Sequence, residues 1–148
     1  MIKKFLIIVL YLSFFTTATA EEIFLSLKKN KVNVRYGPSL ESPIKYVYKK
    51  INLPIKQIDK KENFRRIIDH KKNSGWIHIS QLKKSNSLVV LEDKIIFSKN
   101  TKFSKPLFKL ERGRLVIVKK CISNWCKIKS GNYIGWLQTQ NSWGEILN

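Results

Sequence analysis

Short apolar runs separated by turn-forming residues recur along this chain. Val, Ile, Tyr, Phe and Trp gather in the runs, and Gly, Pro, Asn, Asp and Lys stand between them. Helical periodicity is absent, so the pattern predicts β-strands. In the first half we expect strands at residues 24–27, 32–35, 44–48, 53–59, 64–69 and 75–78. In the second half we expect them at residues 87–90, 94–97, 106–110, 114–121, 125–129 and 133–137.

The order of polar and apolar positions within the runs predicts how deeply each strand is buried. Residues 45–48 and 55–58 alternate imperfectly between polar and apolar side chains, which is typical of half-buried strands. Residues 115–118 are Leu-Val-Ile-Val without interruption, so we expect this segment to be buried on both faces.

The pattern of the first half is repeated in the second half. Residues 63–77 contain Asn-Phe-Arg-Arg-Ile and then Gly-Trp-Ile, and residues 124–137 contain Asn-Trp-Cys-Lys-Ile and then Gly-Trp-Leu. Pro-Ile at 43 and 44 recurs as Pro-Leu 63 residues later, while Gly-Trp recurs after 60 residues, as loop deletions in a duplicated unit would leave it. We therefore predict a first domain at residues 21–85 and a second, divergent domain at residues 86–148.

Each half has room for a small barrel. Five or six short strands in some 60 residues favour an all-β fold that nearly closes on itself and so removes exposed sheet edges. The link near residues 83–87 is polar and lacks a Gly/Pro-rich spacer, so we expect the two modules to pack against each other. The predicted architecture is two tandem small β-barrels.

Residues 1–20 have the features of a secretory signal peptide. Lys3 and Lys4 precede an apolar run at residues 5–15, and Ala-Thr-Ala at 18–20 is a small-x-small cleavage site. An uncleaved spanning helix is the alternative, but it needs about 20 apolar residues. We expect cleavage after Ala20, a periplasmic or secreted protein that begins at Glu21, and no transmembrane span after cleavage.

The chain is strongly basic. Its 29 Lys and Arg residues against 10 Asp and Glu residues give a net charge of +19, and loss of Lys3 and Lys4 with the signal would leave +17. Such a charge favours anionic partners, for example an anionic envelope surface. The lysines are scattered along the chain, so compositional drift is an equal alternative. Export makes nucleic acid an unlikely partner despite the pI of about 10.1.

The two cysteines predict a disulfide. Cys121 and Cys126 flank an expected hairpin turn, and a bridge between them would persist in an exported chain. A metal site is disfavoured, because four ligands are usual and the only histidines, His70 and His78, lie in the other half.

A set of short motifs resembles bacterial SH3-like (SH3b) domains. Residues 32–39 read Val-Asn-Val-Arg-Tyr-Gly-Pro-Ser, similar to the opening strand and turn of that family, and the two Gly-Trp strands stand where its closing Gly-Trp-Val falls. With Trp-Gly at 143 and 144, the chain looks in particular like the tandem SH3-like proteins exported by alphaproteobacteria. The second half has Ser-Lys-Asn-Thr at 98–101 in place of the Arg-x-Gly-Pro turn. The resemblance implies two tandem SH3-like β-barrels.

The resemblance also implies a non-catalytic binding module, most often for cell-wall peptide or glycan. An aromatic groove with two arginines able to grip a carboxylate is expected in the first module. Its candidate ligand-binding residues are Arg35, Tyr36, Tyr46, Tyr48, Arg66 and Trp76. For Trp76 and Trp136 a core position at a strand end is the favoured alternative. We expect the first module to bind and the second to stabilise it.

Other function classes find less support in the sequence. Nucleophilic catalysis needs an activated Cys or Ser near a base, and the cysteines are expected to pair with each other. No phosphate-binding glycine loop occurs, so we expect no enzyme and no cofactor. The alternatives to cell-wall binding are a protein-protein interaction or scaffold role in the envelope, and non-specific attachment to lipid or polyphosphate through charge.

Overall fold

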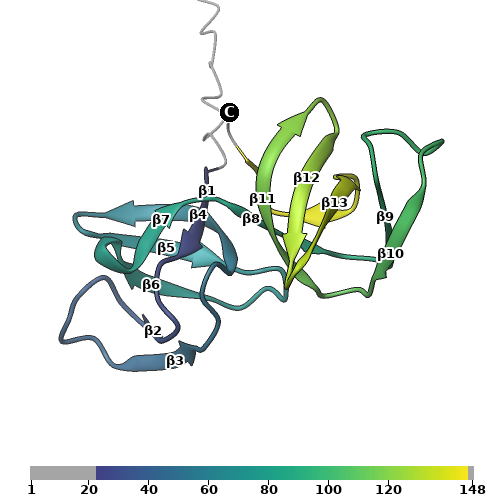
Figure 1. Cartoon of the computed structure of the whole chain (residues 1–148). Coiled ribbons are helices and arrows are strands. Elements are labelled where there is room, and N and C mark those ends of the chain that lie inside the picture. Colours follow the sequence, from purple (N-terminus) through teal and green to yellow (C-terminus); the bar gives the residue numbers. More distant parts are fainter. Residues whose placement is uncertain (1–22, 147–148) are drawn as a thin grey trace, which may run out of the picture.

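The computed structural model describes residues 23–146, which form fourteen strands and one short 3-10 helix (Figure 1). The predicted signal peptide at residues 1–20 lies outside the described residues. No helix among residues 23–146 is long and apolar enough to cross a membrane.

The strands form two sheets of seven, one in each half of the chain. The first sheet consists of β1 (Ile23–Leu27), β2 (Val32–Arg35), β3 (Ile44–Tyr48), β4 (Pro54–Lys61), β5 (Phe64–Ile68), β6 (Ser74–His78) and β7 (Leu82–Lys84). The second consists of β8 (Ser87–Val90), β9 (Lys94–Phe97), β10 (Pro106–Leu110), β11 (Leu115–Ile122), β12 (Trp125–Ser130), β13 (Tyr133–Gln138) and β14 (Ser142–Trp143). The helix η1 (Ile79–Gln81) joins β6 to β7.

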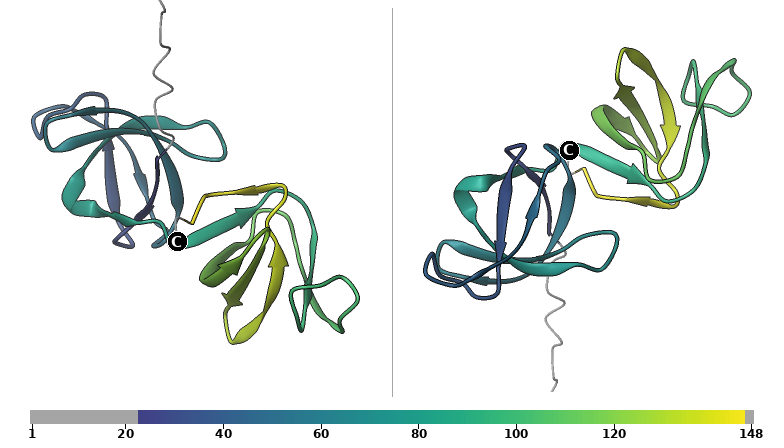
Figure 2. Two further views of the ribbon diagram at one scale, coloured as in Figure 1. Left: turned by 90° about the horizontal axis from the view of Figure 1, so that it is seen from above. Right: turned by 90° about the horizontal axis from the view of Figure 1, so that it is seen from below.

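The two sheets have the same topology. Their orders are β3-β2-β6-β5-β4-β1-β7 and β10-β9-β13-β12-β11-β8-β14, so each strand of the second sheet is the counterpart of the strand seven places earlier. Both sheets bend around their own cores, and Figure 2 shows them as separate bodies joined by the chain. The prediction of an all-β fold built from two tandem small units is therefore confirmed.

All twelve expected strands are present, with ends shifted by at most two residues. Two short strands, β7 and β14, were not predicted. The expected link at residues 83–87 is wrong in extent, because β7 ends at Lys84 and β8 begins at Ser87. Burial of residues 115–118 on both faces is also wrong: Val116 is fully buried, whereas its neighbours are half-buried.

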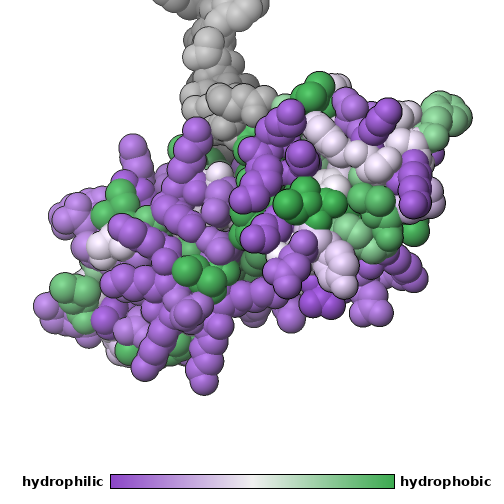
Figure 3. Space-filling model, viewed as in Figure 1, coloured by the Kyte–Doolittle hydropathy of each residue, from purple (hydrophilic) through white to green (hydrophobic). Residues whose placement is uncertain are grey.

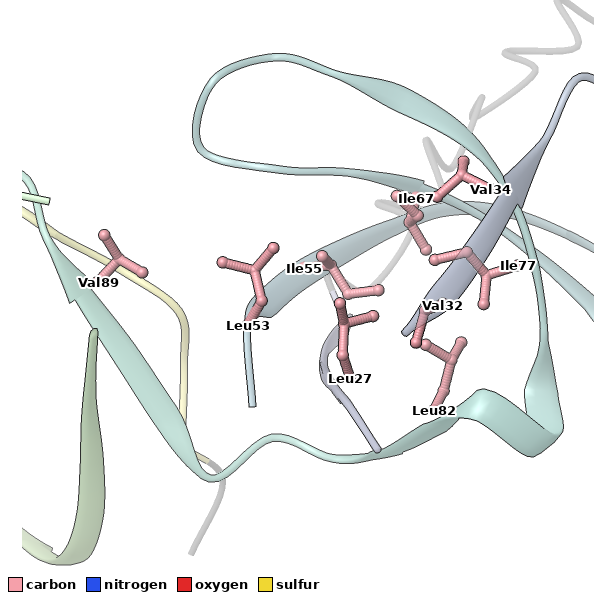
Figure 4. Packing of buried hydrophobic residues seen from close by; sticks show 9 residues of the cluster. All are labelled: Leu27, Val32, Val34, Leu53, Ile55, Ile67, Ile77, Leu82 and Val89. Carbon is pink, nitrogen blue, oxygen red and sulfur yellow. The ribbon is translucent and has the colours of Figure 1, made fainter. Parts of the chain in front are cut away.

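The core of the first module is a cluster of aliphatic side chains from six of its strands and the segment before β4. Its members, shown in Figure 4, are Leu27, Val32, Val34, Leu53, Ile55, Ile67, Ile77, Leu82 and Val89. Val89 comes from β8 of the second sheet. Side chains from strands so far apart in the sheet order can meet only if the sheet is curled. The second core is built in the same way from Leu88, Val90, Ile96, Leu110, Val116, Cys126, Ile128 and Leu137.

The repeated tryptophans lie outside these cores. In β6 and β13 the buried positions are the glycine before the tryptophan and the aliphatic residue after it, and Trp76 and Trp136 are half-buried on the other face. The expectation that both tryptophans are core residues is therefore wrong. The period of a strand explains it, because Ile77 and Leu137 occupy the inward positions.

The strand β8 lies at the junction of the modules, and all four of its residues are buried. Val89 joins the first core, whereas Leu88 and Val90 join the second. The Ser87 hydroxyl is 3.1 Å from the Ser26 hydroxyl of β1. The expectation that the modules pack together is confirmed by these contacts.

The predicted disulfide is present between Cys121 and Cys126. The two residues are direct cross-strand partners in the β11–β12 hairpin, with Cα atoms 4.0 Å apart. Ser123 has a φ of 54° in the connecting turn. The bridge thus closes the end of one hairpin.

Candidate functional site

A row of three side chains crosses the outer face of the first module. Trp76 of β6 is paired with Arg35 of β2 on one side and with Arg66 of β5 on the other. Directly opposite residues of adjacent antiparallel strands place their side chains on the same face about 5 Å apart. The register therefore sets one guanidinium group on each side of the indole.

These residues line a hollow of about 290 Å³ together with Tyr36 and Lys45. Tyr36 follows β2 directly and is 65% exposed. The Lys45 ammonium lies 5.6 Å from the centre of the Tyr36 ring and donates a hydrogen bond to the carbonyl of Ser74. Four of the six predicted residues, namely Arg35, Tyr36, Arg66 and Trp76, are thus brought together.

A hydrogen-bonded turn at residues 36–43 supports one side of the hollow. The Arg35 guanidinium donates to the carbonyl of Ser42 at 2.8 Å, so this cation is held in place while retaining donors for a ligand. The Glu41 carboxyl accepts a hydrogen bond from Ser39, which lowers its pKa with a smaller contribution from Arg35. One acid therefore stays ionised near Arg35.

Arg66 is the freer of the two arginines. It is exposed, and its side chain makes no hydrogen bond or ion pair within residues 23–146. A planar guanidinium of this kind can bind a carboxylate through two parallel hydrogen bonds. As the cross-strand neighbour of Trp76, it suits a ligand that combines an anion with an apolar surface.

Tyr46 and Tyr48 do not belong to this hollow. They stand two residues apart on β3 and pack against the first core, with ring centres 5.2 Å apart. The Tyr48 hydroxyl donates to the buried carboxylate of Asp69 at 3.0 Å. Burial raises the pKa of both phenols. The structure gives this tyrosine pair a packing role, apart from the Trp76 site.

The counterpart of this site in the second module has a different chemistry. Trp136 is paired with Phe97 and Lys127, which stand where Arg35 and Arg66 stand beside Trp76. The Lys120 ammonium lies 5.6 Å from the centre of the Trp136 ring. Neither arginine is kept, so the second module offers no guanidinium pair here.

The turn beside it keeps its hydrogen bonds although the Arg-x-Gly-Pro sequence is lost. Thr101 N–H donates to the carbonyl of Lys99 and Ser104 N–H to that of Thr101, as Ser39 and Ser42 do in the first module. The sequence indicated a lost turn, but the backbone pattern is kept in both modules. The Thr101 hydroxyl accepts from the Phe103 N–H as the Ser39 hydroxyl accepts from the Glu41 N–H.

Sequence reasoning missed Lys45 and Ser74 as members of the hollow. Lys45 stands on the face of β3 opposite to Tyr46, and its charge was counted only in the general basic balance. The alternation of residues 45–48 was the available signal, because Lys45 and Tyr46 must point to opposite faces.

Groups suited to metal binding or catalysis are few. No three His, Cys, Asp or Glu residues gather in a metal-binding arrangement within residues 23–146. The Nδ1 atom of His78 lies 2.8 Å from the hydroxyl of Ser80, and the same nitrogen accepts from the Ser80 N–H at the start of η1. This pair caps a helical turn.

Polar side chains dominate the face seen in Figure 3, with apolar residues scattered between them. A further hollow of about 440 Å³ lies in the second module next to Phe108 and Tyr133. The cation Lys109 at its edge is paired with Asp93 at 2.8 Å. The other charged residues that line this hollow are Arg114 and the acid Glu111, whereas the hollow beside Trp76 has Arg35, Arg66 and Lys45 and no acid in its lining. The hollow beside Trp76 is therefore the more positive of the two although it is smaller.

The fold and the duplicated Gly-Trp strands define a pair of small SH3-like modules. A family model described as "Bacterial SH3 domain" matches residues 28–84 and again residues 96–144. These two matches cover more than half of the chain, which belongs to the bacterial SH3 domain family.

Similar solved structures include two proteins from Trichomonas vaginalis. NlpC2 is 13% identical with a TM-score of 0.39, and the match covers 84% of this chain and 48% of that chain. NlpC1 is 12% identical with a TM-score of 0.39, and the match covers 88% of this chain and 48% of that chain. This chain thus spans about half the length of either structure. No curated protein matches it.

Proposed function

We propose that the protein is a non-catalytic binding protein of the cell envelope, and that its first module binds a carboxylate-bearing part of the cell wall. The observation that carries the proposal is the pair of guanidinium groups on either side of Trp76 in one hollow. Peptide stems of peptidoglycan carry free carboxylates, and an indole face suits their apolar atoms or a sugar ring. Membership of the bacterial SH3 domain family supports this reading.

The place of action follows from the N-terminal sequence. Lys3 and Lys4, the apolar run at 5–15 and the small-x-small site ending at Ala20 support export to the periplasm or the medium. A basic protein released there meets an anionic wall, and long-range attraction would raise the rate of encounter.

A sacculus-binding assay tests the proposal. We expect the purified protein to be retained by isolated sacculi at physiological salt, and Arg66→Ala to weaken binding about tenfold, because one charge-assisted hydrogen-bonding group is lost. Arg66 is preferred to Arg35 for this test, since Arg35 also holds Ser42. Tyr36→Ala should weaken binding as well.

The second module supplies the matched control. Lys127 is the counterpart of Arg66 beside Trp136, so Lys127→Ala removes the same charge from the same place in the other copy. Equal loss of binding in both variants would point to general charge attraction and count against the site. No retention of the unaltered protein would contradict peptidoglycan as the ligand.

A protein partner is the second candidate, and one observation favours it. In the second module, β10 and β13 carry exposed apolar side chains near Trp136, with Leu107 45% and Ile134 48% exposed. Exposed apolar residues that lie together are typical of protein-binding surfaces. Crosslinking in envelope fractions should then recover one stoichiometric partner, and Leu107→Lys should abolish it.

A further inference from the structure

The turn before the long strand β4 is repeated before β11, and both copies lie at the junction. Asn52 has a φ of 63° and donates its N–H to the carbonyl of Leu27 at 2.9 Å. Gly113 has a φ of 85° and donates its N–H to the carbonyl of Val90 at 2.7 Å. Duplication has therefore produced two turns of the same construction, one in each module.

The side chains of these two turns meet in a hollow of about 160 Å³. Lys50 from the first turn lines it together with Glu111, Arg112, Gly113 and Arg114 from the second. All five residues are exposed. Three cations from two modules thus converge around one small space that contains a single acid.

A second hollow of about 320 Å³ adjoins the first and shares Lys50 and Gly113 with it. Leu53 and Val89, both buried core residues, form an apolar part of its lining. The remaining lining residues are Tyr48, Asp69, His70, Lys71 and Asn73. This volume lies at the lower end of the range for small-molecule sites.

Positive charge predominates over the two hollows. Asp69 is only 3% exposed, and its oxygens accept hydrogen bonds from the Tyr48 hydroxyl and from the N–H groups of Lys71 and Asn73. The cations Lys50, Lys71, Arg112 and Arg114 outnumber the acids Asp69 and Glu111. None of these cations has an ion-pair partner among residues 23–146.

Cations that outnumber the acids around them repel one another, and a bound anion lowers that cost. We propose that the junction between the modules binds a small oxyanion-bearing carbohydrate or organic acid. Its carboxylate or phosphate lies among Lys50, Arg112 and Arg114, and its uncharged part lies over Leu53 and Val89 beside Tyr48. Neither module alone contains this site.

The two histidines allow anion binding at the junction to be measured directly, with His70 as the reporter and His78 as the reference. His70 lines the larger hollow, whereas His78 lies on β6 and is bonded to Ser80. Burial lowers the pKa of His70, and a nearby anion should raise it. We expect glucuronate or glucose 6-phosphate at millimolar concentration in phosphate-free buffer to raise the pKa of His70, followed by NMR of the imidazole protons, and to leave His78 unchanged.

Variants and probes separate the outcomes. The double variant Lys50→Ala/Arg112→Ala should weaken binding at least tenfold, whereas Lys49→Ala/Lys102→Ala, which removes two exposed cations that line neither hollow, should not. Response to glucuronate alone assigns a carboxylate ligand, response to glucose 6-phosphate alone assigns a phosphate ligand, and response to both assigns a general oxyanion site. Arg66→Ala should leave all of these responses intact, so this site is tested apart from the cell-wall site.

The proposal is overturned by any of three results. These are no shift of His70 with either anion, an equal shift with uncharged glucose, or a shift that persists in the Lys50→Ala/Arg112→Ala variant. Circular dichroism of each variant checks folding, and the exposure of the substituted side chains predicts that the fold is kept.

Discussion

The glycine before each repeated tryptophan is required by close packing of strands. A Cβ atom on Gly75 would lie 2.4 Å from Val34 Cγ1 and 3.0 Å from the carbonyl oxygen of Arg35. On Gly135 it would lie 2.4 Å from Ile96 Cγ2. The repeated Gly-Trp pair therefore combines a tight inner contact with a tryptophan on the outer face.

Gly75→Ala should destabilise the first module by about 2 kcal/mol, because the added methyl group overpacks the core beside Val34. Urea unfolding measures the change. Gly131→Ala is the control: nothing lies within 4 Å of its Cβ position, and only its φ of +58° opposes a side chain, at about 1 kcal/mol. A smaller loss for Gly75→Ala than for the control would contradict the packing argument.

The Tyr48 phenol makes the folding stability depend on pH in the alkaline range. Burial, with the Tyr46 hydroxyl and the Asp69 carboxylate nearby, raises its pKa far above the ordinary value of about 10. Because the pKa of Tyr48 is raised in the folded state, the stability that the protonated phenol contributes is fully present below about pH 10. It is lost as the pH rises above that value.

Tyr48→Phe should therefore flatten the fall of unfolding free energy above pH 10, measured by urea titration at a series of pH values. At neutral pH the same change should cost about 1 kcal/mol for the lost hydrogen bond to Asp69. Tyr36→Phe serves as the control, since Tyr36 is mostly exposed. If the unfolding free energy of Tyr48→Phe falls above pH 10 as steeply as that of the unaltered protein, Tyr48 is not the cause of the alkaline pH dependence.

The candidate site could be predicted in part from single residues. Arg35, Tyr36, Arg66 and Trp76 were chosen for their chemistry, but it is the strand register that joins them, and the sequence does not state a register. Tyr48 does not line the hollow beside Trp76, and the reason is physical. Its hydrogen-bond partner Asp69 lies 21 residues away, and no sequence pattern near Tyr48 indicates that contact.

At the scale of elements, the β11–β12 hairpin is closed by its disulfide. The loop between Cys121 and Cys126 is short, so the chain-entropy model assigns the bridge about 2 kcal/mol. Cys121→Ser/Cys126→Ser should lower the unfolding free energy of the second module by this amount while its far-ultraviolet circular dichroism stays β-type. Loss of the whole β signal at 25 °C would show that the bridge holds the module rather than the hairpin.

The pattern of apolar and polar residues predicts a strand well where the apolar run is long. It fails where a short segment becomes a strand only by pairing with a neighbouring strand. The twelve expected strands carry Val, Ile, Tyr, Phe or Trp in alternation or in runs. The missed strands β7 and β14 are three and two residues long, and they exist because β1 and β8 offer free edges to pair with. Such pairing depends on distant residues, which a local pattern cannot contain.

At the scale of the whole molecule, the C-terminal strand ties the second module to the first. Trp143 of β14 donates its indole N–H to the carbonyl of Pro54 at 3.0 Å, and its ring stands edge-on to Phe24 with centres 5.3 Å apart. The Lys72 ammonium lies 5.8 Å from the same ring. Small modules of this size are marginal alone, so this contact is expected to couple their unfolding.

Trp143→Ala should break that coupling. We expect a loss of about 3 kcal/mol and a change from one cooperative transition to two, because the indole is the main side chain that joins β14 to the first module. Calorimetry measures this directly: the calorimetric and van't Hoff enthalpies should agree for the unaltered protein and differ for the variant. Phe103→Ala is the matched control, since that aromatic ring is fully exposed and should contribute nothing. Two separate transitions already present in the unaltered protein would mean that β8 and Trp143 pack without coupling the modules.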